Sequence, residues 1–411
     1  MTATPACLGC GAPLTRTWVD LGIQPLANSN IRPENASAPE PRYPLHARVC
    51  DECLLVQVES VVPREAIFND DYAYFSSFSD SWLVHCKAYA AAMTARFGLG
   101  PQSQVVEIAS NDGYMLQYFV AAGVPVLGVE PSANTAEAAI ARGVPTDISF
   151  FGLETAQRLA AEGHSADLLA AKNVLAHVPD INDFAAGIAA LLKPEGVFTV
   201  EFPHLLRTIE GVQFDTIYHE HFTYLSLLAV QNVFARHGLR VFDVEQYATH
   251  GGSLRVFACR DGAGHVLQPG VARVRDLEIA AGLDRPQGYE GFDARCQAVR
   301  DGLNAFLSTA RAEGKTVAGY GAAAKGNTLL NYCGAGADAM LFIADRSPAK
   351  QGRLAPGSHI PIVAPETIFE ARPDYVLILP WNLRTEVTAQ LAGIRAWGGK
   401  LVTAIPAILV D

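Results

Sequence analysis

The sequence lacks any long uninterrupted apolar run, although 50% of its residues are hydrophobic. Its apolar stretches, such as residues 375–379, fall well short of the ~18 residues that a membrane-spanning helix needs. Residues 1–5 also lack the basic and apolar regions of a signal peptide. We therefore expect a cytoplasmic protein with no membrane partner.

An excess of positive charge is also missing. The chain has 31 Lys and Arg residues against 42 Asp and Glu residues, a net charge of −11. Sequence-independent binders of nucleic acid need a basic face, so this class is not expected. The charged fraction of 18% is too low, and the hydrophobic content too high, for a disordered chain. The 411 residues predict two or three globular domains.

Cysteine is sparse after residue 53. Four of the eight cysteines are scattered, and reduced cytosolic thiols do not build a disulfide framework. The others form two Cys-x2-Cys pairs: Cys7, Cys10, Cys50 and Cys53. Two such pairs can complete the tetrahedral four-thiolate shell of a structural zinc ion. The alternatives are unrelated buried thiols and a redox pair, and the paired spacing favours zinc.

From about Ser103 the sequence alternates between predicted strands and helices. This rhythm indicates a parallel, doubly wound sheet, in which ligands bind at the carboxyl ends of the strands. The predicted strands are 105–109, 125–130, 167–171 and 197–202, and the predicted helices are 114–122, 134–142 and 181–192.

Two acids mark the ligand edge of this sheet. Glu107 lies on the first strand, Glu130 ends the second, and the turn between them contains a single glycine, Gly113. The turn matches the glycine-rich dinucleotide fingerprint poorly. An acid, a loop and a second acid in this order favour S-adenosylmethionine over ordinary strand-end acids, because the second acid can accept the ribose hydroxyls. His177 follows the third strand and is either structural or part of the site.

The segment 215–224 holds the densest cluster of titratable groups: Tyr218, His219, Glu220 and His221. In an extended segment, Tyr218 and Glu220 would face one way and the two histidines the other. The cluster is compatible with proton transfer by a neutral imidazole, with a buried hydrogen-bond network, or with a metal site. Zinc proteases space their histidines four residues apart, unlike this segment.

The last third predicts a second α/β unit. Strands at 239–243 and 254–259 precede a helical stretch over 284–313 and then a strand, glycine turn and helix over 315–327. Backbone amides at such a helix start attract phosphate, and Lys325 adds a positive charge. Asp345 lies near the ribose-binding spacing of a dinucleotide site. A diphosphate is favoured there, with a dinucleotide or a pure scaffold as alternatives.

Five motifs, taken in order, resemble the sugar C-methyltransferase family, which methylates C-3 of nucleotide-linked 4-keto deoxysugars. They are the four cysteines and the segments 20–28, 107–113, 218–221 and 319–326. The resemblance implies an α/β protein in three parts. These are a zinc-binding module (1–70), a Rossmann-like S-adenosylmethionine-dependent methyltransferase domain (71–240) and a second Rossmann-like α/β domain (241–411). It places a nucleotide-diphosphate sugar, expected to be dTDP-linked, between the last two.

The resemblance also implies site residues. His221 is expected to act as the general base, oriented by Glu220, and the enolate donors are expected among Tyr218, His177 and Tyr72. Tyr72 is chosen over Tyr74 by its spacing. The expected cofactor-binding residues are Glu107, Ala109, Asn111, Gly113, Glu130 and Asn173. The expected substrate-binding residues are Lys325, Tyr320 and Asn327. An O- or N-methyltransferase and a zinc-stabilised, non-catalytic nucleotide-binding scaffold are the alternatives.

Overall fold

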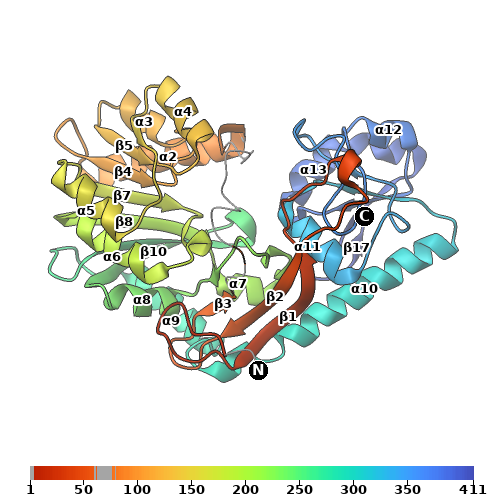
Figure 1. The fold of residues 1–411 in the computed structure, drawn as a ribbon, viewed down its shortest axis with the longest axis horizontal. Helices are drawn as coiled ribbons and strands as arrows, with labels where there is room; N and C mark the ends of the chain where they lie inside the picture. The colour runs from red at the N-terminus through yellow and green to blue at the C-terminus, as the bar shows by residue number, and fades with distance from the viewer. Residues whose placement is uncertain (1–3, 60–61, 63–75, 79) are drawn as a thin grey trace.

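The computed structural model of the chain describes residues 4–59, 62, 76–78 and 80–411. Its strands form sheets of four, seven and six strands. Figure 1 shows the two larger sheets in separate lobes, with the paired strands β1 (Arg16–Pro25) and β2 (Arg42–Val49) and the long helix α10 (Phe292–Ala312) at their base. The three-part α/β architecture expected from the sequence is confirmed.

No helix in the described ranges is both long enough and apolar enough to cross a membrane.

The middle sheet has the strand order β10-β11-β8-β7-β4-β5-β6. Its strands are β4 (Val105–Ile108), β5 (Val126–Val129), β6 (Thr146–Asp147), β7 (Ala166–Lys172), β8 (Leu192–Pro203), β10 (Leu239–Tyr247) and β11 (Ser253–Arg260). The pairs from β8 to β6 are parallel, β11 pairs antiparallel with β8, and β10 pairs antiparallel with β11. β4 and β5 are buried throughout, as expected for parallel strands covered on both faces.

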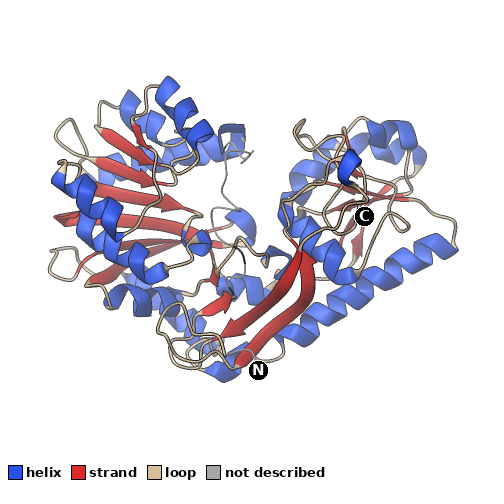
Figure 2. Ribbon diagram, viewed as in Figure 1, coloured by secondary structure: helices blue, strands red, loops and turns tan. Residues whose placement is uncertain are grey.

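Helices cover both faces of this sheet (Figure 2). They are α2 (Asp80–Phe97), α3 (Leu116–Ala121), α4 (Ala133–Ala141), α5 (Leu153–Ala161), α6 (Ile181–Leu191), α7 (Leu205–Glu210), α8 (Leu227–Ala235) and α9 (Pro269–Ala280). The start of α6 shows the local reason for one of these boundaries. The Asp180 carboxylate accepts hydrogen bonds from the amides of Asn182 and Asp183, which the first helical turn leaves without intrahelical partners.

The carboxyl-terminal sheet has the order β14-β13-β12-β15-β16-β17. Its strands are β12 (Val317–Tyr320), β13 (Ile343–Ala344), β14 (Ile362–Val363), β15 (Tyr375–Ile378), β16 (Lys400–Thr403) and β17 (Leu409–Val410). Its helices are α10 (Phe292–Ala312), α11 (Ala324–Cys333), α12 (Thr367–Ala371) and α13 (Arg384–Gln390). The expected domain boundary at residue 241 falls inside β10. Because β10 and β11 pair with the middle sheet, that unit extends through Arg260.

The amino-terminal sheet joins the three parts. β1 (Arg16–Pro25), β2 (Arg42–Val49) and β3 (Val56–Val58) continue into β9 (Thr223–Tyr224), which belongs to the middle of the chain. Trp18 on β1 stacks on Phe292 of α10, with ring centroids 4.2 Å apart. One buried apolar cluster contains residues from all three parts. The amino-terminal module therefore packs against both lobes and contacts the segment that carries His221.

Candidate active site

The turn after β4 has the positive φ angles typical of a glycine-rich loop, although only one of the three residues concerned is a glycine. Ala109, Asn111 and Gly113 have φ angles of 54°, 49° and 75°. Non-glycine residues rarely adopt this left-handed region, and such strain gathers at functional sites. The three positions lie at the carboxyl end of β4, which is flanked by β5 and β7. A ligand of a doubly wound sheet binds at such a topological switch point.

Glu130 joins this turn to the end of β5. Its Oε2 accepts a hydrogen bond from the Asn111 amide at 3.0 Å, and its Oε1 accepts one from the Ser132 amide at 2.9 Å. Each carboxylate oxygen has a second lone pair, so both can still accept a hydroxyl. Burial raises the pKa of Glu130. The two amides therefore hold the carboxylate in a fixed position at the carboxyl end of β5.

Glu107 lies on β4, beside the same turn. Its side chain is fully buried, and Tyr114 lies within hydrogen-bonding reach of its carboxylate. Burial raises the pKa of Glu107 well above its ordinary value. A buried acid is costly unless donors surround it. S-adenosylmethionine carries both an ammonium group and ribose hydroxyls, so the pair Glu107 and Glu130 fits it.

We expect Glu130→Gln to weaken S-adenosylmethionine binding about tenfold or more, because a hydrogen bond to a charged group contributes ~1.5–3 kcal/mol. Isothermal titration calorimetry measures the Kd. Glu137→Gln, on the exposed side of α4, is the matched control and should bind as the wild type does. Equal affinity in both variants would contradict the ribose role of Glu130.

The four amino-terminal cysteines converge on one point. Their Sγ atoms lie within 4.8 Å of one another, with 3.5 Å between Cys7 and Cys53 and 3.5 Å between Cys10 and Cys50. A tetrahedral zinc ion with Zn–S bonds of ~2.3 Å requires S–S separations of about 3.8 Å. The thiols fit a closed structural zinc site, as the sequence predicted.

The segment 218–221 is a turn, so the alternation that an extended segment would give does not apply. The His221 amide donates to the Tyr218 carbonyl at 2.9 Å, which closes the turn. The Tyr218 and His221 rings therefore lie together, with centroids 3.9 Å apart, instead of on opposite faces. His219 points away to the amino-terminal module, where its Nε2 lies 3.1 Å from the Pro44 carbonyl oxygen.

Backbone carbonyls set the tautomers of two neighbouring histidines. His221 Nδ1 lies 2.8 Å from the Thr216 carbonyl oxygen, and His177 Nδ1 lies 2.8 Å from that of Glu220. A carbonyl can only accept, so each ring carries its proton on Nδ1 and a lone pair on Nε2. Burial lowers the pKa of His177 to about 4 and that of His221 well below its ordinary value. Both rings are neutral at pH 7.

These tautomers distinguish the roles expected of His221 and His177. The Nε2 lone pair of His221 suits a general base. His177 cannot donate through its Nε2, so its expected role as an enolate donor does not agree with the geometry. The His177 ring centroid lies 4.6 Å from the His221 ring centroid. In this tautomer the Nε2 of His177 can only accept a hydrogen bond. Tyr72, a further expected donor, lies outside the described residues.

Glu220 does not orient His221, contrary to the expectation. Both of its carboxylate oxygens accept from the Asn28 amide at 2.8 Å, and the Thr216 carbonyl holds the His221 ring instead. Burial raises the pKa of Glu220. Metal is not favoured at this loop, since in the described ranges only the four cysteines have the geometry of a metal site.

Lys325, in the first turn of α11, lies across the junction of the lobes from His221, and we call the space between these two residues the recess. Its Nζ donates to Asn382 Oδ1 at 2.9 Å and lies 5.0 Å from the Trp381 ring centroid. Burial lowers the pKa of Lys325, whose charge in turn helps to lower the pKa of His221. Trp381 donates through Nε1 to Asp215 Oδ2 at 2.8 Å, linking the lobes. The cation and the base therefore share one space.

The glycine turn of the carboxyl-terminal sheet is built like the cofactor turn. Asp345, after β13, accepts from the Ala322 amide at 2.7 Å and from the Ser347 amide at 2.8 Å. The two other expected substrate residues have internal partners. Tyr320 donates to Gln390 Oε1 at 2.7 Å, and the buried Asn327 donates to the Ala27 carbonyl at 2.7 Å.

The sequence motifs assign no role to His250, Trp82, Thr216 or Trp381. His250 has a φ of 55°, and its Nε2 lies 3.3 Å from the Nδ2 of Asn173, an expected cofactor residue. The histidine beside two glycines was the only signal in the sequence for this position. Nothing in the sequence places the other three beside the site.

Comparisons with known proteins agree with this architecture. Three family models match in order: "Putative zinc binding domain" over residues 7–68, "Methyltransferase domain" over 84–244 and "C-methyltransferase C-terminal domain" over 248–406. The C-methyltransferase NovU of Streptomyces niveus is 37% identical over 400 residues, which cover 97% of this chain and 95% of that protein.

More distant similarities cover a smaller share of the chain. A ubiquinone biosynthesis O-methyltransferase of Chelativorans sp. (strain BNC1) is 28% identical over 116 residues, 26% of this chain and 46% of that protein. The solved structure of magnesium protoporphyrin IX methyltransferase from Synechocystis PCC 6803 is 14% identical, with a TM-score of 0.34. That match covers 48% of this chain and 88% of the solved chain.

Proposed function

Because this chain belongs to the S-adenosylmethionine-dependent C-methyltransferase family, with an amino-terminal zinc-binding domain, we propose that it methylates C-3 of a nucleotide-linked 4-keto deoxysugar. The observation that carries the proposal is the pairing of a neutral imidazole base with a buried ammonium group. His221 comes from the middle unit and Lys325 from the carboxyl-terminal unit, and both face one recess.

A 4-ketone acidifies the hydrogen at C-3, so a positioned imidazole can remove it. The proton moves to His221 Nε2, and the electron pair passes to the carbonyl oxygen as an enolate. The Thr216 carbonyl keeps Nδ1 as the donor nitrogen and stabilises the imidazolium that forms. When bound, S-adenosylmethionine supplies the electrophilic methyl group that C-3 takes.

Lys325 supports recognition of a diphosphate. Its side chain is largely surrounded by protein, and a cation in such a site gains most from a charged partner. The turn that Asp345 holds lies next to Lys325 in the chain, at the start of α11. We propose that Lys325 neutralises the diphosphate of the nucleotide sugar, while the turn receives its nucleoside, expected to be thymidine.

We expect Lys325→Ala to raise the KM for the nucleotide sugar by about 10–100-fold, the equivalent of losing one charge-assisted bond. Steady-state kinetics give the KM, and calorimetry should show the S-adenosylmethionine Kd within about threefold of wild type. Lys315→Ala, which breaks an exposed pair with Asp374, is the matched control. A KM unchanged by Lys325→Ala would remove the diphosphate role.

The experiment that tests the reaction class is mass spectrometry of nucleotide 4-keto sugars after incubation with S-adenosylmethionine, with a parallel incubation in deuterium oxide. If the enzyme is a C-methyltransferase, the C-3 hydrogen should exchange with solvent deuterium while S-adenosylhomocysteine blocks methyl transfer. Methyl transfer without such exchange, or onto sugars that lack the 4-ketone, would replace the proposal by O- or N-methylation.

A further inference from the structure

His250 lies in a strained loop that no role assigned above explains. His250, Gly251 and Gly252 have φ angles of 55°, 88° and 119°, three left-handed residues in a row. Glycine adopts this region freely, but histidine does so at an energetic cost. A strained residue persists when the surrounding structure over-determines it, and such residues gather at ligand sites.

The loop is held from several sides. Gln213 Nε2 donates to the Gly251 carbonyl at 3.0 Å, and the His204 amide donates to the Gly252 carbonyl at 2.9 Å. A Cβ at Gly251 would lie 2.5 Å from Trp381 Cη2, so this backbone sits directly against the carboxyl-terminal unit. A Cβ at Gly252 would lie 2.6 Å from Arg207 Cγ. The fold thus fixes His250 at the junction of the lobes.

The His250 side chain lines the recess. It is accessible to solvent, and burial by the surrounding protein, together with the charge of Lys325, lowers its pKa to about 4. Asn173 Nδ2 lies 3.3 Å from its Nε2, and an amide NH2 can only donate. The His250 ring is therefore neutral, with its proton on Nδ1.

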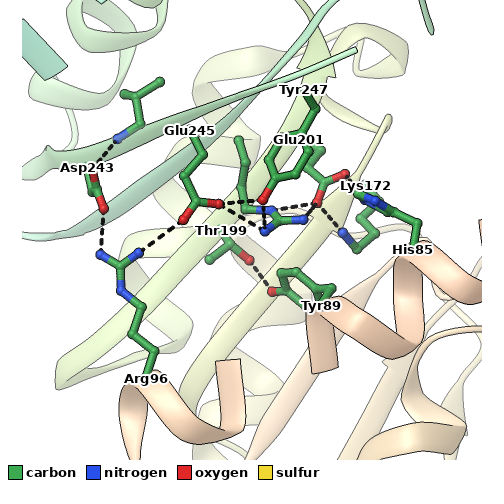
Figure 3. A network of polar contacts seen from close by, with 11 residues as sticks. His85, Tyr89, Arg96, Lys172, Thr199, Glu201, Asp243, Glu245 and Tyr247 are labelled. Atoms are coloured by element: carbon green, nitrogen blue, oxygen red, sulfur yellow. Dashed lines mark hydrogen bonds and ion pairs between the residues drawn. The ribbon is translucent and has the colours of Figure 1, made fainter. Parts of the chain in front are cut away.

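Figure 3 shows a buried ionic network that includes Lys172, Glu201 and His85. Glu201 pairs with Lys172 and Arg255, and its Oε2 lies 2.9 Å from His85 Nε2. His85 stacks on Trp82 with ring centroids 5.1 Å apart, and Trp82 meets the His250 ring at 6.0 Å with an interplanar angle of 67°.

His250 also lies within electrostatic reach of the reacting groups. Lys325 helps to lower the pKa of His250, and both His250 and Lys325 help to lower that of His221. Asn173, at the end of β7, places His250 beside the cofactor edge as well. The recess contains the base His221, the acceptor nitrogen of His177 and Tyr218, whose ring centroid lies 3.9 Å from that of His221, and His250 adds a further neutral donor to this set.

We propose that His250 Nδ1–H donates a hydrogen bond to the substrate oxygen that gains negative charge when His221 removes the proton. This inference rests on the proposed function. No proton passes from His250: the substrate C–H proton goes to His221 Nε2, and the electron pair remains on the substrate oxygen. Preorganised donors of this kind act most strongly in sites that exclude water.

Three substitutions test this role. His250→Asn places an amide NH2 near the position of Nδ1 and tolerates a positive φ. His250→Gln carries its amide further out, and His250→Gly removes the donor while relieving the backbone strain. We expect the Asn variant to retain kcat within about tenfold, and the Gly and Gln variants to lose about 10²–10³-fold in kcat and in C-3 exchange. The Kd for S-adenosylmethionine should stay within about threefold.

The outcomes are separable. Wild-type C-3 exchange in a Gly variant, or equal losses in the Asn and Gln variants, would overturn the donor role and leave the proposed reaction standing. A wild-type enzyme that methylates without any C-3 exchange would overturn both, since no oxyanion would then form. A purely structural role for His250 predicts a Gly variant at least as active as wild type.

Discussion

His221→Asn should reduce kcat by about 10²–10⁴-fold, the usual contribution of a general base. The Asn amide can still donate to the Thr216 carbonyl in place of Nδ1, so the loop keeps its hydrogen bond. What is lost is the Nε2 lone pair that accepts the C-3 proton. Exchange of the C-3 hydrogen in deuterium oxide should fall in parallel with kcat, and the S-adenosylmethionine Kd should be unchanged.

The neighbouring histidine supplies the control. His219 contacts the Pro44 carbonyl and lies away from the recess, so His219→Asn should affect the melting temperature more than kcat. Burial and nearby positive groups hold the pKa of His221 well below its ordinary value. The base is therefore already unprotonated at neutral pH and gains its proton only when the pH falls well below its ordinary pKa, so its acid limb in kcat/KM should lie below pH 6.5. Full turnover in His221→Asn would remove the residue from its role.

Loss of zinc should have the second large effect, although the thiol cluster does no chemistry. Only two residues separate Cys53 from β3, which pairs with β9 immediately after Phe222. The Val58 amide also donates to the Phe222 carbonyl at 3.0 Å. Asn28 holds Glu220 in the same loop. The module therefore contacts the chain on both sides of His221.

We expect Cys53→Ser to lose its zinc, about one ion per chain, and at least about 100-fold in kcat, because a displacement of about 1 Å at a catalytic group can cost this much. Stability should fall too, since metal binding supplies folding energy in small modules. Elemental analysis and steady-state kinetics measure the effects.

Cys333→Ser, at a buried thiol outside the cluster, should retain the metal. S-adenosylmethionine should still bind to the Cys53 variant, because the turn after β4 and Glu130 belong to the middle sheet. A metal-free protein with wild-type kcat would show that the module does not position the loop.

The local features of the site were accessible from the sequence because short-range chemistry encodes them. The β4 and β5 strands, the acids Glu107 and Glu130, and the paired cysteines are each read from spacing within a few residues. The left-handed turn at Ala109 and Asn111 could not be predicted from the sequence, because neither residue type requires a positive φ. The turn adopts this backbone because it follows β4 directly and places the Asn111 amide against the Glu130 carboxylate.

The unit boundary was harder to place for a related reason. A strand pattern at 239–243 predicts a strand but not its neighbour. β10 and β11 join the middle sheet because β11 pairs antiparallel with β8, a choice made by packing across the sheet edge. Periodicity within the segment carries no information about that partner.

The sequence by itself determined the three-part α/β order, the four-cysteine site and the presence of His221 and Lys325 at ligand edges. The tertiary structure decided what these groups can do. The carbonyls of Thr216 and Glu220 select the tautomers of His221 and His177, and Asn28 takes Glu220 away from the base. A tautomer depends on which partner lies within about 3 Å of a ring nitrogen, and that is a property of contacts between distant segments.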